Sequence, residues 1–485
     1  MNHKDPRELI LHSPMSRMQV MVVGITIALN ALDGFDVLSI SLAAPAIRNE
    51  LGIGPAATGL LLAMELIGMA IGSIFLGRLA DAWGRRPMML GCLVLMTAGM
   101  FMVTTSPGVL AWSAKSVMNL LGVLEEWPIE LVHISVWRIV TGLGIGGLLA
   151  AINAVVAEYS NAKKKHMNVS LMSIGYPVGA SLGGFVASWL LIDHTWRSVF
   201  YLGFAMTAVM IPIVYFLVPE TVAWQVRNAK PGTLEKVNAT LRKMGHAAVA
   251  ALPDVTGERA RQKVGGNIFA PKFLRTTAIV TIAYFFHIMT FYFILKWTGV
   301  ILVDRGFAES QAGAVLSWVN VGGATGGALL GFLTLRYDLK ALTMGAMALS
   351  TAAVVVYAWG PADLWQITLT CIACGFFINA AINGMYAIFA HAYPTHLRSA
   401  GTGFAIGVGR GGSLLAPIAA GLLFEGGISV PVVATIMAGG SLVAAIVLMF
   451  LKLDREPPEV VEAKEVEAAA AEPKGTVAFG SPVTT

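Results

Sequence analysis

Apolar residues follow one another in long uninterrupted runs along most of this chain. Twelve runs are long enough for a helix that crosses the ~30 Å hydrocarbon layer of a bilayer. They are predicted at 18–44, 56–77, 87–105, 133–157, 166–190, 198–218, 274–302, 312–335, 339–358, 364–389, 400–424 and 430–452. Membrane β-strands are only about 10 residues long and alternate apolar with polar residues. The pattern therefore predicts an all-α membrane protein with twelve transmembrane helices.

Composition agrees with this pattern, since 56% of the 485 residues are hydrophobic, 13% are charged and the mean hydropathy is +0.72. The first 17 residues are polar and the first apolar run is too long for a signal peptide. The first helix is therefore expected to stay in the mature protein and not to be cleaved off. Cys92, Cys371 and Cys374 all fall in predicted spans, where small packing roles are expected rather than disulfides or a redox pair. No metal or cofactor site is predicted.

The distribution of positive charge predicts the orientation. Of the 33 Lys and Arg residues, 26 lie in the termini or in loops on the same side as the termini. Only Arg48, Lys115, Arg197 and Arg305 lie in loops on the opposite side. Because cytoplasmic loops carry the excess of Lys and Arg, both termini are expected in the cytoplasm. The net charge of +5 is then a topology signal, and no nucleic-acid partner is expected.

The chain divides into two similar halves. Residues 219–273 are basic, contain Pro and Gly and lack a long apolar run, so they are expected to be a cytoplasmic linker between spans 18–218 and spans 274–452. Gly68, Gly72 and Gly77 match Gly322, Gly326 and Gly331 at an offset of 254 residues, while Tyr159 matches Tyr393 at an offset of 234. A duplicated bundle of six helices with the site at the midplane is the architecture of alternating-access carriers.

The smaller second offset predicts about 20 extra residues in the first half, which we assign to 106–132. Trp112, Leu120, Leu121, Leu124 and Trp127 predict an amphipathic helix in the outer membrane interface. The segment is either a tolerated loop insertion or a lid over the substrate entrance. At the C-terminal end of the chain, residues 453–485 are rich in Glu, Ala and Val and are expected to be a disordered cytoplasmic tail. Residues 1–17 are expected to be a cytoplasmic N-terminal tail.

Two acids interrupt the first span, in "LDGFDV". Helical spacing places Asn30, Asp33 and Asp36 within about 120° of one face. A charge at mid-bilayer costs ~2.5–3.5 kcal/mol, so this face is expected to turn toward the protein interior. Burial and a like charge one turn away both favour the protonated carboxyl, which suits a proton carrier. The alternative is that both acids only pair with internal Arg residues. Gly34 lets another helix or the substrate approach closely.

Three cations fall in predicted spans. Arg138, ahead of the glycine-rich "TGLGIGG", is expected to pair with Asp33 or Asp36 and to be released when the acid takes a proton. Arg410, between glycines in the eleventh span, suits bidentate capture of a carboxylate, the alternative being structural pairing. Lys296 either snorkels to the outer interface or faces a cavity.

Polar and aromatic residues in other spans are candidates for completing a binding site. His287 falls opposite Asp33 at the offset of 254 and is a candidate second titrating group. Asn379 and Asn383 share a helical face. The further candidates are Tyr292, Asn320 and Tyr386. Each of them is also compatible with a satisfied core position, and Glu65, in the second span, receives no assignment.

The loop "GRLADAWGRRP" is predicted to form a gating latch from Arg78, Asp81, Arg85 and Arg86. Asp81 is expected either to bind the N-terminus of the third span or to pair with Arg85, and the latch is expected to break when the inner side opens. In the second half Leu335 replaces the Asp, so that copy of the latch is degenerate.

These motifs resemble known ones. "GRLADAWGRRP" is similar to the signature loop of the major facilitator superfamily, and "RIVTGLGIGG" and "PETVAW" resemble two of its other motifs. Within it, "DGFD" and "YPTHLRSAGTGFAIGVGRGGSLLAP" resemble the bacterial aromatic acid:proton symporters, which carry benzoate-like anions across the inner membrane. The resemblance implies roles for Asp33 and Asp36 in proton coupling, Asp81 in the latch, and Arg138 and Arg410 in transport.

The resulting hypothesis is a monomeric, multi-pass inner-membrane importer of an aromatic carboxylate together with protons. Its substrate contacts are expected from Arg410, Asn379, Asn383, Tyr386, His287, Lys296 and Tyr292. Because Lys296 stands where a small polar residue is expected, a dicarboxylate such as muconate is an open alternative. A sugar substrate is less favoured, since "YFFHIMTFYF" lacks paired glutamines. A membrane enzyme is disfavoured, since His391 and His396 do not share a helical face, and a nontransporting sensor on the same scaffold is a further, less favoured alternative.

Overall fold

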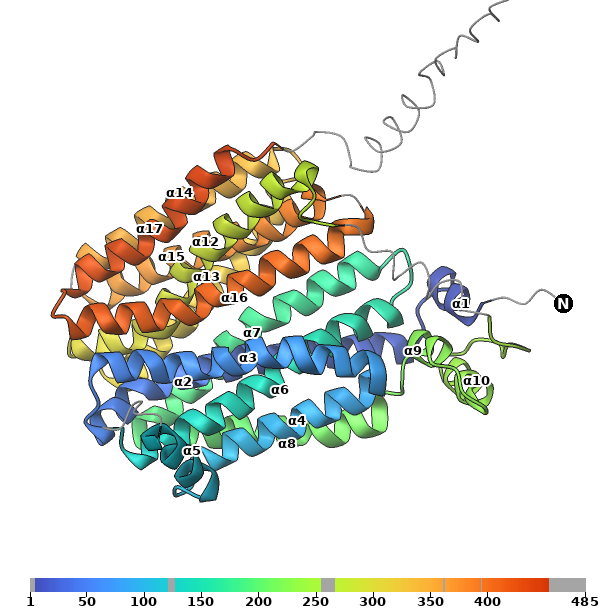
Figure 1. Cartoon of the computed structure of the whole chain (residues 1–485), viewed down its shortest axis with the longest axis horizontal. Helices are drawn as coiled ribbons and strands as arrows, with labels where there is room; N and C mark the ends of the chain where they lie inside the picture. Colours follow the sequence, from blue (N-terminus) through green and yellow to red (C-terminus); the bar gives the residue numbers. More distant parts are fainter. Residues whose placement is uncertain (1–4, 121–126, 254–266, 361–362, 394, 453–485) are drawn as a thin grey trace, which may run out of the picture.

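The computed structural model describes residues 5–120, 127–253, 267–360, 363–393 and 395–452. Its long helices form two bundles that lie side by side (Figure 1). The N-terminal bundle consists of α2 (Arg17–Leu51), α3 (Pro55–Trp83), α4 (Arg85–Met102), α6 (Ile129–Tyr159), α7 (Lys165–Asp193) and α8 (Arg197–Leu217). The C-terminal bundle consists of α12 (Pro271–Asp304), α13 (Glu309–Leu333), α14 (Leu339–Trp359), α15 (Leu364–Ala392), α16 (Thr395–Glu425) and α17 (Val430–Met449).

These twelve helices confirm the predicted fold class. Among the residues that the structure describes, eleven helices are long and apolar enough to span a membrane, and α4, the shortest of the twelve, falls outside that criterion. Several helices extend past the predicted apolar runs. The first was predicted to end at 44 but continues to Leu51, with Pro45 inside it. The ends of a helix are set by its backbone hydrogen bonds, so a helix can extend beyond the apolar run that crosses the hydrocarbon layer.

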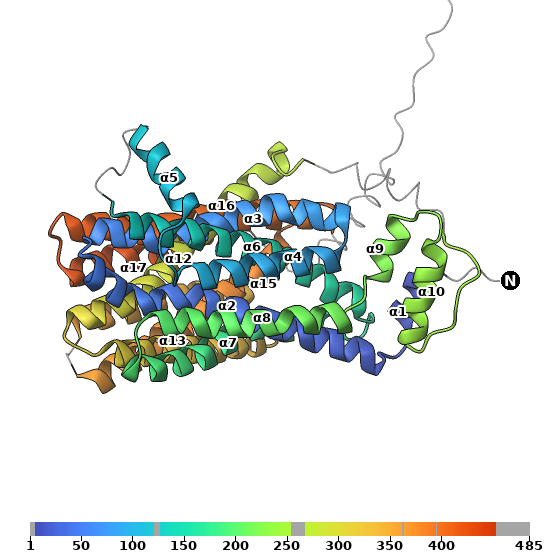
Figure 2. The same ribbon diagram turned by 90° about the horizontal axis from the view of Figure 1, so that it is seen from below.

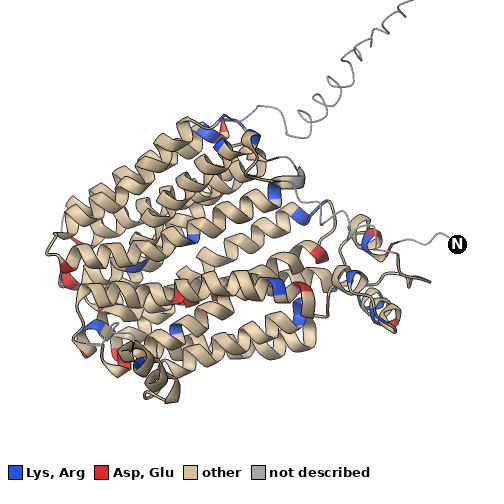
Figure 3. Ribbon diagram, viewed as in Figure 1, with Lys and Arg blue, Asp and Glu red and all other residues tan. Residues whose placement is uncertain are grey.

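Short helices lie at the two ends of the bundles. We call the end where α2 and α12 finish, at Leu51 and Asp304, the distal end, and the opposite end the linker end. The helices α1 (Pro6–His12), α9 (Val222–Arg227) and α10 (Thr233–Lys243) lie beyond the linker end, at the right of Figure 1. Charged residues gather mostly at the ends of the helices, and only a few lie between them (Figure 3).

The predicted insertion contains α5 (Val109–Leu120), which projects from the side of the bundle in Figure 2. It packs against α6 and exposes Trp112 and Leu120. Leu121 and Leu124 lie outside the described residues. The choice between a lid and a tolerated insertion stays a prediction.

Glycines bring α3 and α6 into backbone contact, and the equivalent glycines do the same in the second bundle. A side chain at Gly68 would collide with the carbonyl oxygen of Ile139, as one at Gly322 would collide with that of Ile372. Gly142 lies against the carbonyl of Glu65, and Gly375 lies in the same way against Val319. The offset of 254 residues in sequence therefore corresponds to the same helix packing in both bundles.

The two bundles contact each other through α3 with α16, α7 with α13, and α2 with α12. An ion pair, a hydrogen bond and a close glycine contact join the two bundles toward the distal end. Arg48 forms a 2.8 Å ion pair with Asp304, and Glu425 accepts a hydrogen bond from the backbone N–H of Ala56 at the start of α3. Gly59 lies against the carbonyl of Pro417. Opening of the distal end requires these contacts to separate.

Gly142→Val is expected to destabilise the N-terminal bundle, because its side chain would meet the carbonyl oxygen of Glu65 and force α3 and α6 apart. Overpacking of a core costs about 1–3 kcal/mol, and a backbone obstacle places this variant at the upper end. The measurement is the thermal unfolding midpoint of the purified protein in detergent. Gly91→Val in α4 is the matched control, since no atom lies within 4 Å of the added Cβ. Equal midpoints for the two variants would contradict the expectation.

Candidate functional site

Asp33 and Asp36 lie on α2 and are both fully buried, which confirms that this face turns inward. Neither carboxyl group has a hydrogen-bond partner among the described residues. Their neighbour Asn30 donates a 2.6 Å hydrogen bond to the carbonyl of Met172 on α7. Gly34, between the two acids, lies against the carbonyl oxygen of Tyr176, so its missing side chain lets α7 approach as expected. The site thus contains two buried acids whose carboxyl oxygens accept no hydrogen bond from the residues that the structure describes.

Arg138 does not form the predicted pair with Asp33 or Asp36, and that prediction is wrong. Its guanidinium forms a 2.6 Å ion pair with Glu65 of α3 and donates a 3.0 Å hydrogen bond to the backbone carbonyl of Asp36. It also lies over the ring of Phe200, 5.5 Å from the centroid. The close packing of α3 on α6 through Gly142 brings Glu65 next to Arg138, which explains why the acid of α3 replaces those of α2 as the partner.

Lys296 does not snorkel to the interface either, because it is fully buried. Its ammonium group donates a 2.6 Å hydrogen bond to the carbonyl of Val37 and a 3.2 Å hydrogen bond to Glu65. Glu65 is therefore shared by two cations, one from each bundle. A buried acid between two buried cations is compensated by both, and it connects the N-terminal bundle to the C-terminal bundle at this depth.

His287 is buried inside the C-terminal bundle with both ring nitrogens bonded. Nε2 lies 3.0 Å from the carbonyl oxygen of Ile378, and Nδ1 lies 2.9 Å from the hydroxyl of Ser441. A carbonyl only accepts, so Nε2 carries the proton and Nδ1 is free to accept from the serine. This arrangement is that of a neutral, satisfied histidine; its part in substrate binding or titration stays a prediction.

Asn379 and Asn383 lie on one face of α15, as predicted, and face α13. They lie against Gly323 and Gly327, where a side chain on either glycine would collide with the amide. Asn379 donates to the carbonyl of Gly375, and Asn320 donates to that of Leu316. Asn383 is the more exposed of the two α15 amides. The predicted contact of Asn379 and Asn383 with a substrate is not tested by this geometry.

Tyrosines from both bundles surround the central region. The hydroxyls of Tyr284 and Tyr386 lie 3.1 Å apart, and Tyr386 is exposed. Tyr176 on α7 lies close enough to interact electrostatically with Asp33, Tyr292 and Tyr386. Arg410 is half-buried on α16 and interacts with Asp33 and with Tyr292 in the same way. Within the described part of the chain, its guanidinium has no hydrogen bond or ion pair. The arrangement combines an available cation, aromatic rings and buried acids.

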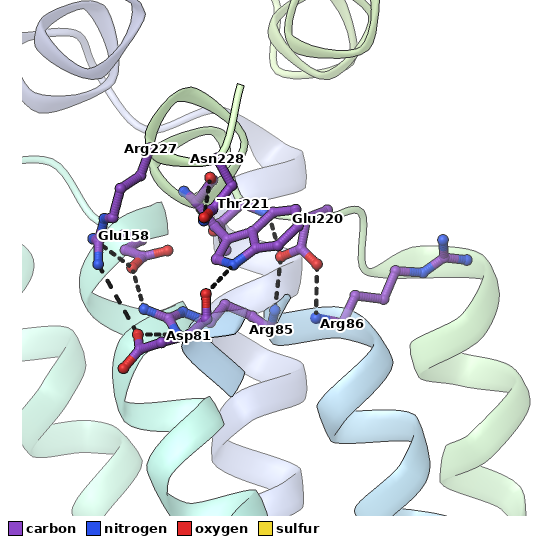
Figure 4. Close-up of polar contacts among 9 residues, drawn as sticks. Asp81, Arg85, Arg86, Glu158, Glu220, Thr221, Arg227 and Asn228 are labelled. Atoms are coloured by element: carbon purple, nitrogen blue, oxygen red, sulfur yellow. Dashed lines mark hydrogen bonds and ion pairs between the residues drawn. The ribbon is translucent and has the colours of Figure 1, made fainter. Parts of the chain in front are cut away.

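The predicted latch is present in part (Figure 4). Arg85 pairs with Asp81 at 2.7 Å and with Glu158 of α6 at 3.3 Å, and Arg227 of α9 lies 4.0 Å from both acids. Of the two expectations for Asp81, the pairing with Arg85 is the one found. Arg78 is exposed. All of these groups belong to the N-terminal bundle or to the linker, so the latch connects these two parts, and its breaking during a transport cycle stays a prediction.

Glu220 takes the position at the N-terminus of α4 that was considered for Asp81. Its carboxylate accepts hydrogen bonds from the backbone N–H groups of Arg85, Arg86 and Thr221 at 3.0, 3.2 and 2.9 Å. Burial raises the pKa of Glu220 above its ordinary value, although these three donors favour the carboxylate and oppose that shift. An acid at a helix N-terminus is stabilised by the free N–H groups. Glu220 thus holds the start of α4 against the segment that leads to α9.

Sequence reasoning missed three residues of this site. Glu65 was recognised only as an acid without a role, and its signal was a carboxylate in an apolar span that required a partner. Tyr176 and Tyr284 gave no signal, because tyrosine in a membrane helix is typical of the membrane–water interface and does not by itself indicate a binding site. Their position in the centre follows from the packing of α7 and α12.

The chain is similar to several known transporters along most of its length. The chain is 24% identical to the gallate transporter of Pseudomonas putida over 92% of this chain and 94% of that protein. It is 27% identical to the 4-hydroxybenzoate transporter PcaK of Pseudomonas putida, covering 85% of this chain and 87% of that one. It is 25% identical to the benzoate transport protein of Acinetobacter baylyi, with 86% of each chain covered.

Solved structures share the fold. The partially occluded inward open conformation of the xylose transporter XylE from E. coli superimposes with a TM-score of 0.68 at 16% identity, covering 91% of this chain and 99% of that one. The family model of the Major Facilitator Superfamily matches residues 26–303 and 277–484, which include both bundles. The chain therefore belongs to the Major Facilitator Superfamily.

Proposed function

We propose that this protein imports an aromatic carboxylate of the benzoate or hydroxybenzoate class together with protons. Three of its relatives carry gallate, 4-hydroxybenzoate and benzoate in their names, and all three compounds are aromatic carboxylic acids. The central region offers what such a molecule requires, namely a cation for the carboxylate and tyrosines for the ring and its hydroxyl groups. Import proceeds by alternating access between the two bundles.

The observation that carries this proposal is the guanidinium of Arg410, which has no hydrogen bond or ion pair in the described part of the chain. It lies in the membrane interior, on the opposite bundle from Asp33, with which it interacts electrostatically. A half-buried cation without a protein partner is a favourable place for an anion, and the guanidinium geometry fits a carboxylate in two parallel hydrogen bonds. Tyr284, Tyr292 and Tyr386 surround the same place.

Proton coupling is assigned to Asp33 and Asp36. Both are buried without hydrogen-bond partners, and an ionised carboxylate in that environment is unfavourable, so this arrangement suits protonated acids. A monovalent anion entering the cell alone works against ~2.3 kcal/mol per 100 mV of membrane potential. One proton per anion removes that opposition. Protonation of Asp33 or Asp36 would not release Arg138 from an ion pair with these acids, because Arg138 is paired with Glu65.

The orientation and setting of the carrier follow from its charges. We assign the linker end to the cytoplasm and the distal end to the periplasm, because the basic linker helices α9 and α10 and the N-terminal helix α1 lie at the linker end. The protein is a multi-pass protein of the bacterial inner membrane and acts as a monomer, since each monomer contains both bundles and the site between them.

The test is uptake of radiolabelled benzoate, 4-hydroxybenzoate or gallate into proteoliposomes that contain the purified protein. A pH gradient is imposed in one direction or the other, with the outside either more acidic or more alkaline than the inside. We expect accumulation of at least one of the three acids only when the outside is acidic. Xylose and muconate serve as competitors. Inhibition by xylose alone would point to a sugar carrier, and inhibition by muconate alone would favour the dicarboxylate alternative. In the present arrangement Lys296 is bonded to Glu65, so of these two cations only Arg410 is open to a substrate carboxylate.

Arg410→Lys is expected to weaken binding of the transported acid about tenfold, because a point charge replaces the two parallel hydrogen bonds of a guanidinium. The measurement is the dissociation constant of the purified protein for the labelled acid. Arg336→Lys, at an exposed position after α13, is the control. Unchanged affinity in Arg410→Lys would assign Arg410 a structural role.

A further inference from the structure

The C-terminal bundle carries two cations at different depths. Lys296 lies on α12, eight residues before its distal end at Asp304, and Arg410 lies on α16, fifteen residues before its distal end at Glu425. With a helical rise of 1.5 Å per residue, these positions are about 12 Å and about 22 Å from the distal end. Lys296 is therefore the first of the two that a molecule entering from the distal end would reach.

The two cations differ in their partners. Lys296 is bonded to Glu65 and to the carbonyl of Val37, and both partners belong to the N-terminal bundle. These bonds persist only while the two bundles are in contact at this depth. Arg410 has no bond of this kind in the described part of the chain. The structure thus occupies the distal cation with an internal acid and leaves the deeper cation available.

Separation of the bundles at the distal end would affect Glu65 and Lys296 differently. Glu65 would keep Arg138, because α3 and α6 belong to the same bundle and are packed together. Lys296 would lose both of its partners. A buried cation that loses its partner is unfavourable until water or an anion replaces it. Separation at the distal end therefore creates a vacant cation where a substrate would enter.

An aromatic-lined cavity lies at the distal end of the bundles, where a molecule on its way to Lys296 would enter. The next residue, Trp297, packs against Phe424 with ring centroids 4.8 Å apart. Both rings line a cavity of about 190 Å³ at the distal contact of the two bundles, together with Arg48 and Asp304, and Lys296 itself lies outside this lining. The ion pair of Arg48 with Asp304 closes this place in the present arrangement.

We propose that Lys296 is the first residue to bind the substrate carboxylate, and that Glu65 competes with that carboxylate for Lys296. When the distal end is open, Lys296 binds the incoming anion. When the bundles close there, Glu65 takes Lys296, and the anion moves on to Arg410. This inference rests on the proposed function and adds two roles to it. Lys296 sets the affinity for the substrate on the distal side, and Glu65 displaces the anion from Lys296 when the distal end closes.

The competition predicts opposite effects for two substitutions. Lys296→Gln is expected to weaken benzoate binding about tenfold or more, as for the loss of one charge-assisted hydrogen bond. Glu65→Gln is expected to tighten benzoate binding about threefold or more, because the competitor is removed while the amide oxygen still accepts a hydrogen bond. Neutral benzamide lacks the carboxylate, so its affinity is expected to change in neither variant. The double variant is expected to bind benzoate as Lys296→Gln does.

The experiment measures dissociation constants of the full-length protein in detergent for benzoate and for benzamide. Lys236→Gln, at an exposed position of the linker helix α10, is the control. Weaker or unchanged benzoate binding in Glu65→Gln, or equal changes for benzoate and benzamide in Lys296→Gln, would overturn the proposal and leave the ion pair a structural feature. If only one variant is obtained as monodisperse protein, it decides alone: Glu65→Gln by the direction of the change, or Lys296→Gln by a loss of affinity for benzoate without a loss for benzamide.

Failure of the proposed function has a different signature. If the wild-type protein neither binds nor transports benzoate, 4-hydroxybenzoate or gallate, the function is wrong and the inference falls with it. If the wild-type protein transports one of them and the two variants show no opposite effects for that acid, only the competition between Glu65 and the substrate is wrong.

Discussion

Asp33→Asn is expected to abolish accumulation of the substrate against its gradient while exchange of internal for external substrate continues. The amide cannot carry a proton in and out, so transport loses its coupling to the pH gradient. Each pH unit sustains about a tenfold concentration ratio per coupled proton, because a factor of ten corresponds to about 1.4 kcal/mol. The variant is expected to reach a ratio of about one at any imposed gradient, set only by equilibration.

The geometry makes this substitution informative. The carboxyl group of Asp33 has no hydrogen-bond partner in the described part of the chain, so the isosteric amide breaks no bond of the folded protein. The measurement is uptake in proteoliposomes under an imposed pH gradient and, in parallel, counterflow without one. Asp363→Asn, at an exposed position before α15, is the control. Asp36→Asn is expected to behave in the same way as Asp33→Asn, and accumulation at the wild-type level in both variants would refute the coupling role.

Glu65→Leu is expected to destabilise the folded protein more than Arg138→Met or Lys296→Met. Glu65 is the anion shared by two buried cations, and its removal leaves both uncompensated, whereas removal of either cation leaves the other paired. Breaking a buried ion pair costs about 3–5 kcal/mol. The measurement is the thermal unfolding midpoint of the three variants in the same detergent.

The control for this comparison is Glu235→Leu, at an exposed position of α10, which is expected to leave the midpoint unchanged. A Glu65→Leu variant as stable as the wild type would contradict the shared role of Glu65. A larger loss in Arg138→Met would instead indicate that the hydrogen bond from Arg138 to the carbonyl of Asp36 and the contact with Phe200 dominate.

The site shows where sequence reasoning succeeds and where it stops. The inward direction of Asp33 and Asp36 followed from three polar residues on one face of an apolar helix. The pairing of Arg138 did not follow, because the nearest predicted acids were on α2 and the actual partner is on α3. The burial of Lys296 did not follow either, since a lysine with a long side chain reaches an interface from many starting depths. Its partner Glu65 lies 231 residues away in the chain.

The number of helices, the division into two halves and the inward turn of the acid pair are properties of local composition. In lipid, each segment must satisfy its own backbone hydrogen bonds and turn its charges away from hydrocarbon. A long apolar run is therefore predicted to be a transmembrane helix from its own sequence. The sharing of Glu65 between Arg138 and Lys296, the capping of α4 by Glu220 and the available guanidinium of Arg410 depend on how helices from distant parts of the chain pack together. A buried charge takes the nearest group of opposite sign in space, and helix packing alone decides which group that is.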